Sequence, residues 1–197
     1  MATAVSISSN ALLMLGDNPI NSFEESASPG GLDRARIAQN LWPSTRDAVL
    51  RSHPWNCAVK RVTLSPEATS PNFTHDFAYQ FILPADWLRN VEINSVNADQ
   101  VDYRVEGKRL LLNSQTLYLR YIYKNTDVST WDPMLVECCE FAMAAKMAYP
   151  ITKSAAVRKE MQDTLLFYMK RARAVDGQDE SPAQLGSFEI LSARRNM

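Results

Sequence analysis

The feature that most constrains the fold is a change of hydrophobic period, which occurs twice along the chain. In RSHPWNCAVKRVTLS, residues 51–65, a helical pattern ends, the chain passes Pro54 and Trp55, and apolar and polar residues then alternate as in a strand. Near residue 131 the helical period returns. This order predicts an α+β protein in which a strand region is inserted between two helical regions.

Two helices are predicted before the first change of period. Residues 4–15 present a broad apolar helical face, and Gly16 follows where a helix usually ends. The next stretch is dense in Gly, Pro, Asn and Ser and is typical of a surface loop. From Leu32 to Leu50 apolar residues recur at spacings near three and four, which predicts the second helix.

Two further helices are predicted after the second change. Asp132 is expected to cap the first of them and Pro133 to occupy its first turn, and apolar residues then cover most of its circumference. The last helix is expected from about Ser154 to Val175 with one apolar stripe, before Gly177. The chain therefore predicts a bundle of about four helices.

The middle of the chain predicts an antiparallel β-meander of four to six strands. Residues 116–125, TLYLRYIYKN, form the clearest strand pattern, and Gly107 lies at a plausible hairpin turn. After the last helix no period is sustained, which indicates an extended tail. The predicted organisation is a helical bundle from residues 1–56 and 131–177, a β domain from residues 57–130, and a C-terminal tail from residues 178–197.

Composition excludes several classes of function. The 197 residues carry a formal net charge of −1, which provides no overall field to attract nucleic acid or an anionic membrane. Three cysteines without CxxC spacing favour a reducing compartment. There is no signal-peptide pattern at the N-terminus and no apolar run near the ~18 residues of a membrane span, so we expect a soluble protein made in the cytoplasm.

Chemistry-bearing residues are few. Cys57 with His53, and His75 beside Asp76, are the residues that a thiol nucleophile and its base would use, but no family-specific signature surrounds the cysteine. Packing of Cys57 beneath the hinge is the favoured interpretation. The spacing of histidines and cysteines matches no zinc pattern, so no metal site and no cofactor is expected.

Apolar residues exceed what a small two-layer core needs. This surplus indicates that some faces are buried by neighbouring copies of the chain. Phe188, Ile190 and Leu191 lie beside Arg194 and Arg195 in an otherwise polar tail, which is typical of a segment that orders on a protein partner.

Five segments in a fixed order span nearly the whole chain after the first helix and loop: RIAQNLWPSTRDAVLRSHPWNCAVKRVTL, YQFILPADWLRNVEI, YRVEGKRLLL, LYLRYIYKNTDVSTWDPMLVECCEFAMAAKMAYPIT and RARAVDGQDE. In this order the chain resembles the tail tubular protein A type of phage head–tail adaptor. It has a shorter N-terminus than the short-tailed coliphage member and a different tail sequence.

The resemblance implies a structural role without enzymatic activity. Proteins of this type form a ring, dodecameric in short-tailed phages, that sits under the portal protein and joins it to the tail nozzle or the next tail ring. By this resemblance the helices pack side by side around the ring, the strand domain faces the distal tail component, and genomic DNA passes through the lumen without sequence-specific binding. The expected location is the head–tail junction of the virion, with no membrane involved.

Residue roles follow from the resemblance together with the residue pattern. Trp55 is expected to anchor the junction between helices and strands, where an indole fixes the angle between the two parts. Phe188, Leu191, Arg194 and Arg195 are expected to bind the portal. A stopper or tail-completion ring one position further down the tail is an alternative function, and a Cys57-dependent enzyme or a DNA-binding module is a more remote one.

Overall fold

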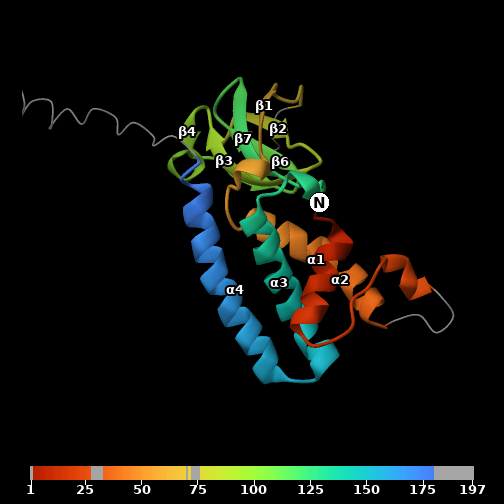
Figure 1. Cartoon of the computed structure of the whole chain (residues 1–197). Coiled ribbons are helices and arrows are strands. Elements are labelled where there is room, and N and C mark those ends of the chain that lie inside the picture. The colour runs from red at the N-terminus through yellow and green to blue at the C-terminus, as the bar shows by residue number, and fades with distance from the viewer. Residues whose placement is uncertain (1, 28–32, 70, 72–75, 180–197) are drawn as a thin grey trace, which may run out of the picture.

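The predicted mixed α+β fold is confirmed by the computed structural model, which describes residues 2–27, 33–69, 71 and 76–179. The strands lie at one end of the molecule and the long helices at the other (Figure 1). Within these residues the α-helices are α1 (Ala4–Met14), α2 (Asp33–Arg51), α3 (Pro133–Thr152) and α4 (Ala155–Asp176). The same residues include the short 3₁₀ turns η1 (Phe23–Ala27), η2 (Asn56–Ala58), η3 (Ala98–Gln100) and η4 (Val128–Thr130).

The helix ends follow from local side-chain chemistry. Thr3 and Ser6 form a reciprocal capping box at the start of α1. The Asp132 carboxylate accepts the backbone N–H of Met134 at 2.7 Å, as expected of the residue that caps the start of α3. Lys153 has a φ of 57°, a left-handed conformation that turns the chain between α3 and α4. Consequently α3 and α4 lie side by side as a helical hairpin (Figure 1).

The strands differ from the predicted single meander. In the described residues they form two antiparallel sheets, in the orders β1-β7-β3-β4 and β2-β6-β5. The last strand in the chain thus lies between the first and the third. The predicted meander order is wrong because the alternation of apolar and polar residues indicates which face of a strand is buried, but not which strand lies beside it. The strands are β1 (Val59–Leu64), β2 (Tyr79–Ile82), β3 (Trp87–Ile93), β4 (Val96–Asn97), β5 (Arg104–Glu106), β6 (Arg109–Leu112) and β7 (Leu117–Tyr123).

Two apolar clusters hold the fold together. One lies within the β region and is centred on residues such as Phe81, Leu110 and Leu119. The larger one fills the space between the helices and also includes Ala58 and Ile122 from the strand region. The helical and strand parts therefore share apolar contacts across the predicted boundary, and their division into separate domains stays a prediction.

Among the described residues, no helix combines the length and the apolar character that crossing a bilayer requires.

Candidate functional site

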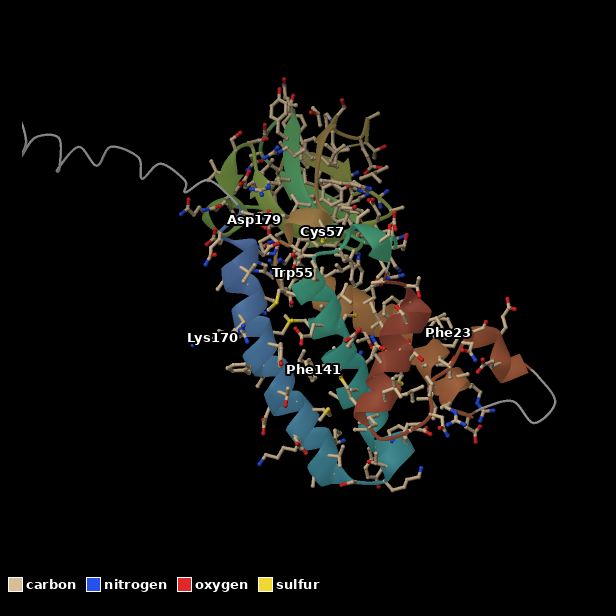
Figure 2. The ribbon with its side chains drawn as sticks, in the orientation of Figure 1. Phe23, Trp55, Cys57, Phe141, Lys170 and Asp179 are labelled. Atoms are coloured by element: carbon tan, nitrogen blue, oxygen red, sulfur yellow. The ribbon has the colours of Figure 1, made fainter. Side chains whose placement is uncertain are left out.

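The junction between helices and strands is built around Trp55. Its side chain is 1% exposed and packs within the larger apolar cluster. The indole Nε1–H donates a hydrogen bond to the carbonyl of Val49 at 3.1 Å, and the His53 ring contacts the indole edge-on at 4.8 Å between centroids. Figure 2 shows Trp55 at the level where the helices meet the strands. A buried indole with its N–H satisfied fixes the turn after α2 in one position.

A polar network ties this turn to the far end of α4. The Asp176 carboxylate accepts the backbone N–H of Asn56 at 3.1 Å and lies 3.2 Å from Nε2 of His53. The side-chain amide of Asn56 donates to the Asp176 carbonyl at 2.8 Å. Burial raises the pKa of Asp176 and lowers the pKa of His53. The C-terminal end of α4 is therefore held against the end of α2.

Other hydrogen bonds tie the same turn to the strands. The Cys57 carbonyl accepts from the amide of Asn125 at 2.8 Å and from the hydroxyl of Tyr123 at 3.3 Å. Nη1 of Arg51 donates to the carbonyl of Leu88 in β3. Trp55 thus lies where α2, α4 and the first sheet meet, and its expected role in keeping ring neighbours in register stays a prediction.

Cys57 lies beside this junction with its thiol half-buried (Figure 2). Burial raises the pKa of the thiol, whereas an activated nucleophile needs a lowered pKa. His53 is paired with Asp176, and His75 lies outside the described residues. The described geometry therefore does not provide Cys57 with the base that the enzyme hypothesis requires. No cluster of three or more metal-ligating side chains occurs in the described part of the chain.

Leu166 and Phe167 form an exposed apolar ridge on the outer side of α4. Leu166 is 70% exposed and Phe167 is 59% exposed, while α4 packs against α3 through its other side. Sequence analysis assigned one apolar stripe and one polar side to this helix, so it missed the ridge. The run LLFYM at residues 165–169 was the available signal, because consecutive apolar residues cannot all lie on one stripe.

An apolar groove lies on the inner flank of the same helix. It is bounded by α2, α3 and α4 and has a volume of about 620 Å³. Its α4 side is formed by Arg158, Gln162, Leu165 and Met169, which are spaced along one face. The other lining residues are Leu41, Thr45, Ala48, Val49 and Ser52 from α2, and Ala142, Ala145, Lys146, Tyr149 and Pro150 from α3.

The residues predicted to bind the portal lie outside the described residues. Phe188, Leu191, Arg194 and Arg195 all belong to residues 180–197, so their assignment stays a prediction. Comparison with known proteins adds no family: no protein-family model matches the chain, and no curated protein matches it.

Proposed function

We propose that this chain is a structural subunit of a phage head–tail connector ring. The observation that carries the proposal is the presence of an apolar ridge and an apolar groove on different sides of α4. Both surfaces are open in the single chain, and their burial would stabilise an assembly at roughly 25 cal/mol per Å² of apolar area. A partner that supplies the complementary surface is therefore expected.

The ridge and the groove lie at different positions around α4, which favours head-to-tail association between copies of the chain. Groove residues such as Leu165 and Met169 lie roughly 120° around the helix axis from the ridge around Leu166 and Phe167. If the ridge of one copy enters the groove of the next, each copy uses two different surfaces. Such a heterologous contact generates a ring when the rotation between copies closes. This geometry agrees with the ring that the resemblance to the tail tubular protein A type implies.

Within the virion this ring would sit under the portal protein and continue into the nozzle or next tail ring. The tail residues Phe188, Leu191, Arg194 and Arg195 would contact the portal, and genomic DNA would pass through the lumen. The formal net charge of −1 is compatible with a channel that does not hold DNA tightly. The proposed activity is mechanical joining, with no substrate and no cofactor.

Mass photometry of the purified chain, alone and mixed with the portal ring from the same phage, tests the function. A complex with about one copy per portal subunit is expected, by analogy with closed symmetric rings. A ring that bound a tail-tube protein but not the portal would instead place the chain in the stopper or tail-completion position. Failure to associate with portal or tail components would overturn the proposal.

Two variants distinguish the contact between neighbouring copies in the ring from the contact between the ring and the portal. Leu166→Ser combined with Phe167→Ser should leave the free chain folded and prevent ring formation. Ile82→Ser is the matched control, because Ile82 is 57% exposed but lies in β2, away from the ridge. Removal of residues 186–197 should leave a folded chain that forms rings but does not bind the portal. A truncated chain that still joined DNA-filled heads would refute the assignment of the portal-binding residues.

A further inference from the structure

Three arginines from separate elements gather at the junction. Arg51 is the last residue of α2, Arg89 lies in β3, and Arg173 lies in the last turn of α4. The hydrogen bond from Arg51 to the carbonyl of Leu88 brings the end of α2 beside Arg89. The pairing of His53 with Asp176 brings the end of α4, and with it Arg173, to the same place.

These arginines lack anionic partners in the described residues. None of the three forms an ion pair with a carboxylate there. Asp176 follows Arg173 by one turn, but its oxygens already accept from the Asn56 N–H and contact His53. Asp179, at the same end of α4 in Figure 2, is exposed and forms no ion pair with them. The positive charges are thus gathered without a matching acid.

Arg89 is the least favourably placed of the three. Its Nε is buried and has no hydrogen-bond partner in the described part of the chain. Burial lowers the pKa of Arg89, and the positive charges of Arg51 and Arg173 lower it further. An unsatisfied buried donor beside like charges costs stability unless an acceptor fills the position. This arrangement is what a site for an anion requires before the anion binds.

We propose that Arg51, Arg89 and Arg173 bind a phosphate group where the ends of α2 and α4 meet β3. Guanidinium groups present several N–H donors in a planar fork, which suits the oxygens of a phosphate. A phosphate dianion offers more acceptor oxygens and more charge than one carboxylate, so it matches three arginines better. The phosphate is either a free anion or the singly charged phosphodiester of a nucleic-acid backbone, and both present anionic oxygens to the site.

Calorimetric titration of the purified full-length chain with inorganic phosphate, at constant ionic strength set by chloride, tests the site. Phosphate should bind, and Arg89→Gln and Arg173→Gln should each weaken binding roughly tenfold or more, the loss of a charge-assisted hydrogen bond. Arg171→Gln is the matched control, since Arg171 is on the same helix but on the ridge side beside Phe167. It should bind phosphate like the unaltered chain.

Two further measurements identify the source of the phosphate and keep the test valid if one variant does not fold. Because Arg173 is exposed, Arg173→Gln should fold even if Arg89→Gln does not. A short single-stranded DNA oligonucleotide that loses affinity in the same variants would assign the phosphate to a nucleic-acid backbone. If inorganic phosphate binds and the oligonucleotide does not, the ligand is a free phosphate anion.

Three results would overturn the proposal. They are no phosphate binding, phosphate binding that Arg89→Gln and Arg173→Gln leave unchanged, and binding of a polyglutamate peptide in place of phosphate. The last result would indicate an acidic protein segment as the ligand. The titration needs neither ring assembly nor the portal, so its outcome is independent of the proposed connector function.

Discussion

Helices α3 and α4 are adjacent and similar in length, with 20 and 22 residues, yet their surroundings differ. In α3 nine residues are buried, and α1, α2 and α4 all pack against it. In α4 only Met169, Ala172 and Asp176 are buried, and large apolar side chains face outward. The contrast teaches that α3 is the centre of the fold, whereas α4 is attached along one side and keeps its other sides available to a partner.

Trp55→Ala should produce the largest loss of stability, because it removes the indole from the larger apolar cluster where the helices meet the strands. Truncation of a buried tryptophan costs roughly 3–5 kcal/mol of unfolding free energy. Urea denaturation followed by circular dichroism measures this loss. Trp55→Phe is the control that keeps an aromatic ring but removes the hydrogen bond to Val49, and it should cost less.

The same variant also tests the expected role of Trp55 in assembly. If Trp55→Ala protein still assembled into normal tails, the tryptophan would not hold the angle between helices and strands.

The same substitution in both helices tests the comparison directly. Leu135 in α3 is 0% exposed, and Leu135→Ala should cost roughly 2–5 kcal/mol. Leu166 in α4 is exposed, and Leu166→Ala should change the stability of the free chain by no more than about 0.5 kcal/mol. Chemical denaturation of the monomer gives both values. Equal losses at the two positions would mean that α4 is as fully packed as α3.

A smaller effect on the unfolding free energy is expected from pH, through the contact between His53 and Asp176 that holds the end of α4. The pKa of His53 in the folded chain lies below its ordinary value of 6.5, mainly because of burial. Its contribution to stability is therefore present above pH 6.5 and is lost as the pH falls through the folded pKa. Burial raises the pKa of Asp176 above its ordinary value of 3.8, so its contribution to stability has the opposite dependence on pH. This contribution is present below pH 3.8 and is lost as the pH rises through the folded pKa.

His53→Gln isolates the histidine contribution. Between about pH 7.5 and about pH 5.5 the unaltered chain should lose more unfolding free energy than His53→Gln does. Denaturation curves at the two pH values provide the comparison. Parallel losses in the two proteins would show that other groups cause the pH dependence.

Cysteine labelling compares α3 with the junction without altering stability. Burial raises the pKa of Cys138 to about 11 and that of Cys139 to about 12, and both side chains are 0% exposed. Iodoacetamide should therefore modify them only when the chain unfolds, and should modify Cys57 slowly. Mass spectrometry of timed samples locates the label. Rapid labelling of Cys57, absent in Cys57→Ser, would restore the nucleophile hypothesis.

Sequence patterns predicted the helices well because their signals are local. Asp132 and Pro133 marked the start of α3, and Gly177 marked the end of α4, within a residue or two of the observed bounds. The strand at residues 116–125 was also predicted and is β7 (Leu117–Tyr123). Capping and periodicity depend on residues a few positions apart, which a single sequence displays.

Features that join distant segments were not predicted. The period of β7 gave no sign that it pairs with both β1 and β3. The contact of Asp176 with Asn56, and the gathering of the three arginines, depend on how α4 returns toward the end of α2. Predicting such contacts requires the packing of whole helices, which depends on the fold and not on spacing along the chain.

The central place of β7 has a consequence for the order of events during synthesis. Val59 of β1 pairs with Ile122 of β7, so the ribosome must release most of the chain before the first sheet can close. The apolar sides of α1 and α2 likewise pack most extensively against α3, which is made later. Closing such long loops is slow compared with forming single helices. The nascent chain therefore exposes its N-terminal apolar surfaces for most of its translation, and a chaperone that shields them would raise the yield of folded protein.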